Sequence, residues 1–111
     1  MSAAADSLDA ALRALADASR RRILEVVREQ SRPVGEIAQR VDMSQQAVSH
    51  HLAVLRGAGL VVERRDGTKH LYVVNADGMR VVQEYLGGFW PKQLSNLKRA
   101  AEDAALKRRR G

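Results

Sequence analysis

The chain has no cysteine among its 111 residues. Disulfide bonds, thiolate metal sites and thiol redox switches are therefore excluded. Aromatic residues are also scarce, at 4% of the chain, while hydrophobic residues as a whole reach 45%. A core must then be built mainly from Leu, Val, Ile and Ala, and this supply favours a helical domain with one small sheet.

Long apolar runs and targeting segments are missing too. No stretch has the roughly 20 apolar residues needed to cross a bilayer. The first six residues, Met-Ser-Ala-Ala-Ala-Asp, lack the basic segment and the apolar run of a signal peptide. We therefore expect a cytoplasmic protein without membrane contact. Its length fits one domain, expected over residues 1–106, followed by a disordered basic tail over residues 107–111.

Signals of catalysis and of metal binding are weak or absent. The sequence has no glycine-rich phosphate loop and no Ser-His-Asp spacing. Of its three histidines, His50 and His51 are adjacent and would point in different directions on a helix, while His70 lies in another segment. We therefore expect neither an enzyme nor a resident metal or cofactor.

Positive charge is concentrated in two parts of the chain, whose net charge is +6. Residues 19–70 hold ten Lys and Arg against six Asp and Glu, and residues 71–111 hold eight against four. The run Lys107-Arg108-Arg109-Arg110 equals the whole excess of the second part. This distribution favours a polyanionic partner.

Four helices are predicted before residue 60 from apolar residues at helical spacing. Asp6 or Ser7 is expected to cap the first helix, and Asp17 the second. Three arginines, residues 20–22, then crowd the first turn of the second helix, where the helix dipole disfavours cations. They are either solvated or close to a phosphate. The third helix is expected over Val34 to Val41.

The fourth helix is expected from Ser44 to Ala58. The Ser44 hydroxyl is suited to accept a free backbone N–H of the first turn. Gly57 and Gly59 mark the end of the helix, because glycine readily adopts the left-handed conformation that closes one. His51 lies beside the apolar side of this helix and is predicted to have a structural role.

The two sides of the fourth helix differ in chemistry. Val48, Leu52 and Leu55 recur at spacings of four and three residues and are expected to face the core. The opposite side is small or hydrogen-bonding, whereas a merely solvated helix face usually carries charge pairs. Such a side suits the major groove, where Gln contacts adenine and Ser or His contacts base edges. We predict DNA contacts from Ser44, Gln45, Gln46, Ser49, His50 and Arg56.

A basic hairpin is predicted next. The segments Leu60 to Val62 and Leu71 to Val74 are rich in strand-forming residues, and Asp66-Gly67 between them is a strong hairpin signal. A basic tip can follow the phosphate backbone or enter the minor groove. A charged edge that prevents strand pairing is the alternative, and both roles are compatible. The cations concerned are Arg64, Arg65 and Lys69.

Helical spacing resumes from Asn75 to Leu86, and Gly87-Gly88 and Pro91 weaken or kink this helix before a last one. The expected fold is mainly α with a small β-hairpin: a winged helix-turn-helix of order α-α-α-α-β-β-α with a C-terminal helical extension. Its terminal helices carry more apolar residues than one such domain can bury. We therefore predict a homodimer with an interface of Leu8, Leu12, Leu15, Met79, Val82, Leu86, Phe89, Trp90, Leu94 and Leu97.

The sequence resembles the ArsR family of bacterial winged-helix repressors. The resemblance runs through Leu15-Ala-Asp-Ala-Ser-Arg-Arg-Arg-Ile-Leu24, Val34-Gly-Glu-Ile-Ala38, Met43-Ser-Gln-Gln-Ala-Val-Ser-His-His-Leu-Ala-Val-Leu55 and Ala58-Gly-Leu-Val61, and continues into the hairpin. It implies a homodimer that represses at a palindromic operator on double-stranded DNA and is released when an inducer binds. The terminal helices would form the dimer interface.

The chain departs from the metal-sensing and persulfide-sensing members of that family. Those members place cysteines in the helix before the recognition helix or elsewhere as a pair, and this chain has none. The expected signal is therefore a non-thiol one, such as a small-molecule inducer. Two alternatives stay open: a metal-responsive sensor with histidine and carboxylate ligands, and a winged-helix adaptor that binds proteins instead of DNA.

Overall fold

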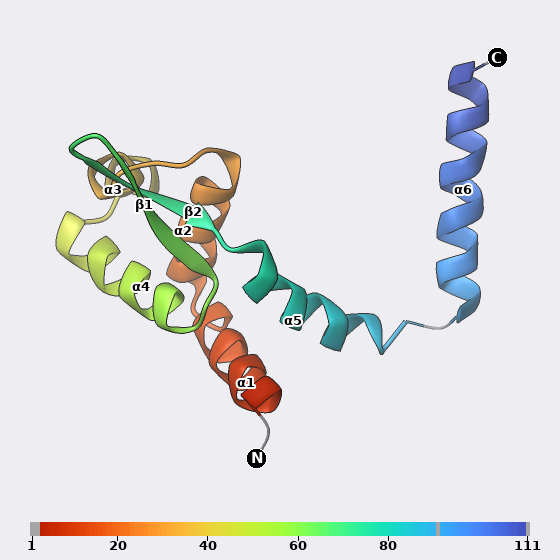
Figure 1. Cartoon of the computed structure of the whole chain (residues 1–111), viewed down its shortest axis with the longest axis horizontal. Helices are drawn as coiled ribbons and strands as arrows, with labels where there is room; N and C mark the ends of the chain where they lie inside the picture. Colours follow the sequence, from red (N-terminus) through yellow and green to blue (C-terminus); the bar gives the residue numbers. More distant parts are fainter. Residues whose placement is uncertain (1–2, 91, 111) are drawn as a thin grey trace.

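The computed structural model describes residues 3–90 and 92–110, with side chains described for residues 5–90 and 96–109. Its helices and strands follow the predicted order (Figure 1). Helices α1 to α4 precede a two-stranded antiparallel hairpin in the sequence, and α5 and α6 follow it. The elements are α1 (Ala3–Leu15), α2 (Ala18–Glu29), α3 (Val34–Val41), α4 (Gln45–Gly57), β1 (Val61–Asp66), β2 (Lys69–Val74), α5 (Ala76–Gly87) and α6 (Lys92–Arg110).

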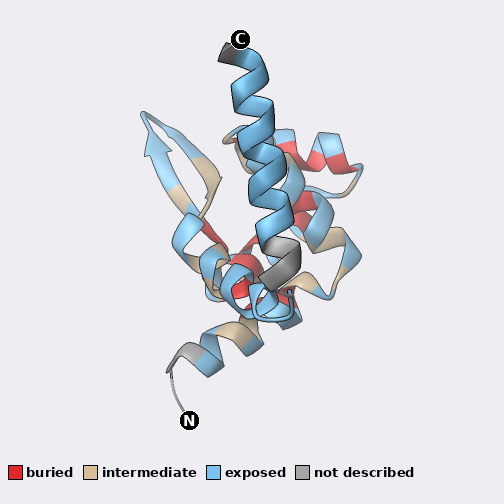
Figure 2. Ribbon diagram, turned by 90° about the vertical axis from the view of Figure 1, so that its right-hand side faces the viewer, coloured by how far each residue is buried: buried red, intermediate tan, exposed pale blue. Residues whose placement is uncertain are grey.

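The core lies where α1 to α4 meet the base of the hairpin and α5. Figure 2 shows the buried residues gathered there, while α6 is exposed over its described side chains. As the composition predicted, the core is aliphatic, and each large side chain buried in it contributes about 1.5–3 kcal/mol. It consists of Ala11, Ala14, Ile23, Val27, Ile37, Ala38, Val41, Val48, Leu52, Leu55, Leu60, Val61 and Val82.

The first two helices test the predicted caps. Asp17 caps α2 as predicted, because its carboxylate accepts the backbone N–H of Arg20 at 3.0 Å. The prediction for α1 was wrong, since the helix begins at Ala3 and not at a cap formed by Asp6 or Ser7. The alanines before Asp6 have the highest helix propensity, and Asp6 in the first turn is favoured by the helix dipole.

The arginines at the start of α2 hydrogen-bond to the ends of other helices. Arg20 Nε donates to the carbonyl of Ala14 at 2.8 Å, and Arg21 Nη1 donates to the carbonyl of Leu15 at 2.7 Å. Arg22 Nη2 donates to the carbonyl of Val41 at 3.0 Å, at the end of α3. The last carbonyls of a helix lack partners within it and attract cations. The sequence predicted that these arginines are either solvated or close to a phosphate. In the structure each donates a hydrogen bond to a backbone carbonyl of the same chain.

The turn between α3 and α4 places the start of α4. Asp42 ends α3 in the left-handed conformation, with φ of 55°. The Ser44 hydroxyl then accepts the backbone N–H of Ala47 at 3.1 Å, which confirms the predicted N-cap. A helix, a tight turn and a capped second helix thus form the helix-turn-helix.

The end of α4 is closed by a Schellman motif. Gly59 has φ of 79°, the N–H of Leu60 donates to the carbonyl of Leu55 at 2.9 Å, and the N–H of Gly59 donates to Arg56 at 3.0 Å. A side chain at Gly59 would be strained by this positive φ. The closing role predicted for Gly59 is confirmed, while Gly57 is the last helical residue.

The start of α5 is joined directly to this end of α4. The Asn75 side-chain amide donates to the carbonyl of Gly59 at 2.9 Å, and the Asn75 backbone N–H donates to Leu60 at 2.9 Å. A Cβ added at Gly78 would lie only 1.8 Å from that same Gly59 oxygen. Gly78 therefore permits a close backbone approach, and α4 and α5 are held in a fixed relation at this joint.

The hairpin is longer than the sequence predicted. Its strands pair from Val61 with Val74 to Asp66 with Lys69, so the predicted tip cations lie within the strands. Gly67, with φ of 64°, is the only one of the two turn residues with positive φ, which is typical of a type II′ turn. Asp66 ends β1 and precedes the two central residues of the turn.

The sequence predicted that the helix after the hairpin is weakened or kinked; in the structure it is interrupted, since α5 ends at Gly87 and α6 begins at Lys92. Pro91 lies outside the described residues. We expected a disordered tail from residue 107, whereas α6 is helical through Arg110. Its Ala, Leu, Lys and Arg residues favour helix, and the cations of its last turn suit the helix dipole. None of the described helices is long and apolar enough to span a membrane.

Candidate nucleic-acid interface

The two sides of α4 are separated as the sequence predicted. Val48, Leu52 and Leu55 are buried in the core. The opposite side is exposed and contains no acidic residue anywhere in the helix. Small and hydrogen-bonding side chains are therefore accessible to a partner along this side of α4. The exposed residues of this side, which we call the α4 face, are Gln46, Ser49, His50 and Ala53.

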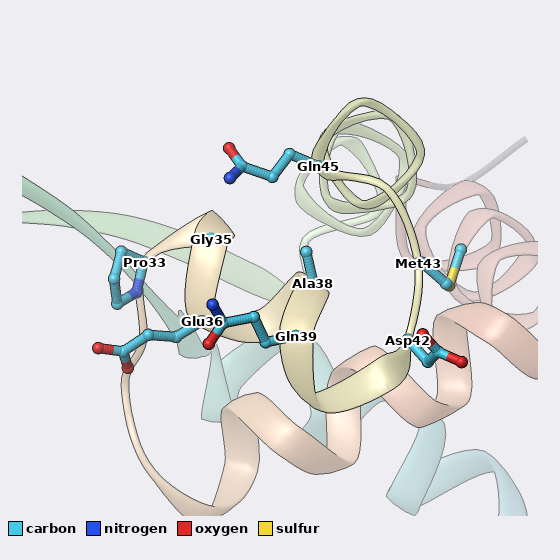
Figure 3. A pocket seen from close by; sticks show the side chains of 8 residues that line it. All are labelled: Pro33, Gly35, Glu36, Ala38, Gln39, Asp42, Met43 and Gln45. Atoms are coloured by element: carbon cyan, nitrogen blue, oxygen red, sulfur yellow. The ribbon is translucent and has the colours of Figure 1, made fainter.

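A hollow of about 540 Å³ lies beside the start of α4, between α3 and the turn (Figure 3). Gln45 extends over it toward α3, and a Cβ at Gly35 would come within 3.4 Å of the Gln45 amide nitrogen. Glu36 and Asp42 also line the hollow. Two carboxylates repel phosphate, so this hollow is not suited to a DNA backbone. The Gln45 side chain borders the hollow and points toward α3.

Arg56, at the end of α4, is paired with the hairpin. Its Nη1 lies 3.1 Å from Oε2 of Glu63 in β1, and Oε1 of Glu63 hydrogen-bonds with Nδ1 of His70 in β2. The hydrogen bond with His70, together with the charges of His70, Arg56 and Arg65, lowers the pKa of the Glu63 carboxyl below its ordinary value of 4.5. Glu63, in β1, therefore links α4 to β2. We call the hairpin formed by β1 and β2 the wing.

A second hollow, of about 430 Å³, lies between α4 and the hairpin. Ser49, Ala53 and Arg56 line it from α4, and Tyr72 lines it from β2. Burial, and then the negative charge of Glu63, raise the pKa of the Tyr72 hydroxyl above its ordinary value of 10.0. The hollow thus collects hydroxyl and guanidinium donors beside the α4 face.

The wing cations are exposed but lie on different faces of the hairpin. Side chains alternate along a strand, so Arg65 shares the face of Glu63, while Arg64 lies on the other face. Lys69 pairs across the strands with Asp66 next to the turn. The sequence predicted these cations as one cluster, and the register separates them.

The histidines do not converge on a metal site. The described residues contain no group of three or more His, Cys, Asp or Glu suited to hold a metal ion. The rings of His50 and His51 are 5.9 Å apart and inclined at 60°, and His70 is taken by Glu63. His51 is half-buried, and among the described residues its buried Nδ1 has no hydrogen-bond partner.

The residues predicted for a dimer interface fall into two groups. Val82 is buried within its own chain, and Leu15 and Met79 are partly buried against the same core. Leu8 is half-buried and Leu12 is 37% exposed. The Leu94 side chain lies outside the described residues. The remaining four large apolar side chains stand at the surface: Leu86 (48% exposed), Phe89 (65%), Trp90 (58%) and Leu97 (67%).

Sequence reasoning missed Glu63, Tyr72 and the partners of the arginines. The alternation of the strand and the glycine turn would have placed Glu63 on one face with Arg65. The approach of Arg56 to that face depends on the angle between α4 and the hairpin, for which the sequence has no local signal.

Comparison with known proteins identifies the family. The sequence pattern of the bacterial regulatory proteins of the arsR family matches residues 17–62 of this chain. These residues run from the cap of α2 to the start of β1. The transcriptional regulator Rv2034 of Mycobacterium tuberculosis is 39% identical over 80% of this chain and 83% of its own.

Two other relatives have opposite regulatory effects in their names. The transcriptional repressor SdpR of Bacillus subtilis is 32% identical over 57% of this chain and 70% of its own. The transcriptional activator HlyU of Vibrio cholerae is 35% identical over 68% of this chain and 69% of its own.

A solved structure has the same arrangement of elements. The homodimeric winged helix-turn-helix DNA-binding domain Mb0332 of Mycobacterium bovis superposes with a TM-score of 0.63 at 27% identity, covering 75% of this chain and 79% of that one. The predicted fold is thus confirmed, and the family consists of transcriptional regulators and not of enzymes. The chain belongs to the ArsR family of winged helix-turn-helix, DNA-binding transcriptional regulators.

Proposed function

We propose that this regulator is a homodimeric repressor that binds a palindromic operator and leaves it when a non-thiol signal binds. One observation carries the proposal. The α4 face is exposed, hydrogen-bonding and free of acidic residues, next to a basic wing. A duplex presents base edges in its major groove and phosphates along its rim, and these two surfaces match that pair of features.

The roles within this interface divide by chemistry. Gln46, Ser49 and His50 would read base edges, because amide, hydroxyl and imidazole groups both donate and accept hydrogen bonds. At the start of the helix, Ser44 would contact the backbone and Gln45 the first bases. The cations Arg56, Arg64, Arg65 and Lys69 would contact phosphates and add affinity that does not depend on sequence.

A dimer is supported by the apolar surface beyond the core. Leu86, Phe89 and Trp90, close together in the sequence, are exposed in the single chain, as is Leu97 of α6, and a second subunit would remove these apolar side chains from water. The solved relative Mb0332 is described as homodimeric. Two subunits related by a twofold axis would read half-sites about 34 Å apart, one turn of the duplex.

Repression is supported by the bulk of a bound dimer and by one relative. A dimer seated on a promoter blocks polymerase by occupying it, and SdpR is named as a repressor. The activator HlyU is the counter-example among the relatives. A regulator that contacts the chromosome of a bacterium acts in the cytoplasm. The signal is proposed to be a small molecule, because the chain has no thiol and the described histidines do not converge.

The experiment that tests this function is the enrichment of bound fragments from the source genome at two salt concentrations. We expect a small set of fragments with a shared inverted repeat, and binding that weakens steeply as salt rises, because phosphate contacts release counterions. A promoter–reporter fusion to the best fragment should be more active without the regulator. No enrichment at low salt would contradict DNA binding, and a less active reporter would assign activation instead.

A further inference from the structure

The wing has few contacts that fix its direction. It is a hairpin of two strands, and such a hairpin is only marginally stable alone. Its base is held by the core residue Val61, by Tyr72 and Val74, which pack partly buried against the core, and by the N–H of Tyr72, which donates to the carbonyl of Arg32 at 3.0 Å. Beyond this base, residues 64–70 are all exposed. Another contact is therefore needed to fix the outer half of the wing.

Glu63 lies at the boundary between base and outer half. It is the one residue from 62 to 70 that is not exposed, and only 22% of its side chain is accessible. In the hairpin it is paired with Tyr72, so His70 is its diagonal neighbour on the same face. A carboxylate at this position can reach the helix on one side and the second strand on the other.

The two carboxylate oxygens are divided between two elements. Oε2 accepts from Arg56 at 3.1 Å, and Oε1 pairs with Nδ1 of His70. Both contacts cross seven residues of sequence, and they join α4 to β1 and β1 to β2. Hydrogen bonds to an ionised carboxylate are stronger than neutral ones and depend on geometry. This pattern constrains direction, unlike a surface ion pair with a single partner.

The side chains around the Glu63 carboxylate are mostly basic. Arg56, Arg65 and His70 all lie around the one carboxylate, and Tyr72 closes the group from the side of the second hollow. Glu63 balances only part of this positive charge, so the face it organises still attracts phosphate. The carboxylate thus sets positions without cancelling the basic character of the wing.

We propose that Glu63 is a positioning residue that holds the wing against the end of α4, with Arg56 on one oxygen and His70 on the other, and so fixes where the wing cations meet the DNA backbone. This inference rests on the proposed function for its DNA half only. The contact between wing and helix exists in the free protein and is tested there separately.

The experiment compares Glu63→Gln with wild type and with Glu25→Gln. The Glu63→Gln change keeps the size of the side chain and removes its charge, while Glu25, exposed on α2, gives the same loss of charge away from the wing. Amide hydrogen exchange of residues 64–70 is measured first in the DNA-free protein. We expect exchange about threefold to tenfold faster in Glu63→Gln only, the size that suits a charged bridge of this kind. Unchanged exchange would overturn the proposal.

Binding to an enriched operator and to random duplex is measured next at one salt concentration. We expect both affinities to fall about threefold to tenfold in Glu63→Gln, with their ratio nearly unchanged, because the wing cations, whose phosphate contacts do not depend on sequence, lose their register with the backbone. Tighter binding to both duplexes with an unchanged ratio would show that Glu63 is only a repelling charge, and would overturn the DNA half. If wild type bound neither duplex, the proposed function would fail, while amide exchange would still decide whether Glu63 holds the wing.

Discussion

The α4 face and the exposed apolar side chains from the end of α5 onward expose opposite kinds of atoms. We call the latter group, Leu86, Phe89, Trp90 and Leu97, the apolar surface. The first exposes amide, hydroxyl and imidazole groups of Gln46, Ser49 and His50 on a helix whose other side is fully buried. The second exposes large apolar side chains, above all Phe89 and Trp90, beyond the core. Polar groups without charge pairs suit a partner with hydrogen-bonding edges, whereas bare apolar groups suit a second apolar surface. In the proposed function the first surface meets DNA and the second meets another copy of the chain.

The two surfaces are also connected differently to the core. The α4 face rests on three buried side chains of the same helix. The apolar surface is reached only through α5, which is fixed to the end of α4 at the Gly59–Gly78 joint. Changes in the core should therefore affect both surfaces, and changes at either surface should affect one.

The largest effect is expected from Leu52→Ala. Leu52 is 1% exposed beneath the α4 face, and its truncation leaves a cavity. The free energy of unfolding should fall by about 2–5 kcal/mol. Ala53→Ser, on the exposed side one residue away, should change it by less than about 0.5 kcal/mol. Urea titration of both variants checks this, and equal losses would show that the two sides of α4 are not distinct.

Trp90→Ala should weaken the proposed dimer without unfolding the subunit. Trp90 is more than half exposed, so its removal costs little within one chain, but buried aromatic anchors dominate interfaces. We expect the dimer dissociation constant to rise about tenfold or more. Leu106→Ala, which removes a similarly exposed residue of α6, should raise it much less. Sedimentation at several concentrations measures both, and similar effects would move the interface away from the α5–α6 connection.

Gly78→Ala tests the joint between the two surfaces. The new Cβ would lie 1.8 Å from a backbone oxygen, so α5 must shift, at a cost of about 1–3 kcal/mol in the free energy of unfolding. Gly87→Ala is the control, because nothing lies within 4 Å of its added Cβ. There alanine should stabilise the helix by about 0.5–1 kcal/mol. Thermal unfolding of the two variants should therefore move in opposite directions.

The smallest effect concerns the caps and pH. The backbone hydrogen bond from Arg20 is the main cause that lowers the pKa of Asp17 below 3.8. A lowered carboxyl pKa adds stability that is complete above the ordinary value and is lost as pH falls through the folded-state value. Asp17→Asn keeps a good cap without a charge. Its stability should therefore fall less than that of wild type between pH 5 and pH 2, measured by urea unfolding, whereas an identical pH profile would contradict this role for the charge.

Much of the fold followed from local signals in the sequence. The cap at Ser44, the closing Gly59 and the apolar spacing of Val48, Leu52 and Leu55 define α4, because each acts over a few residues. The exposed α4 face followed from the same spacing. The start of α1 was missed because a run of alanines carries no cap signal.

The contacts missed by sequence reasoning are those between elements. Glu63 meets Arg56 only because the hairpin turns back toward the end of α4, and Val82 is buried because α5 packs against α1 and the core. Such approaches depend on how helices and strands cross, and no spacing within one element determines them. Arg20 and Arg22, at the start of α2, likewise donate hydrogen bonds to carbonyls at the ends of α1 and α3.

The most direct test of the account is the sequence preference of the double variant Gln46→Ala/Ser49→Ala. Both side chains are exposed on the α4 face, so the fold should be unchanged by circular dichroism. The ratio of operator to random-duplex affinity should fall about tenfold or more, because base-edge contacts carry about 1–3 kcal/mol each, while random-duplex affinity stays nearly constant. An equal loss on both duplexes would contradict base reading by this face.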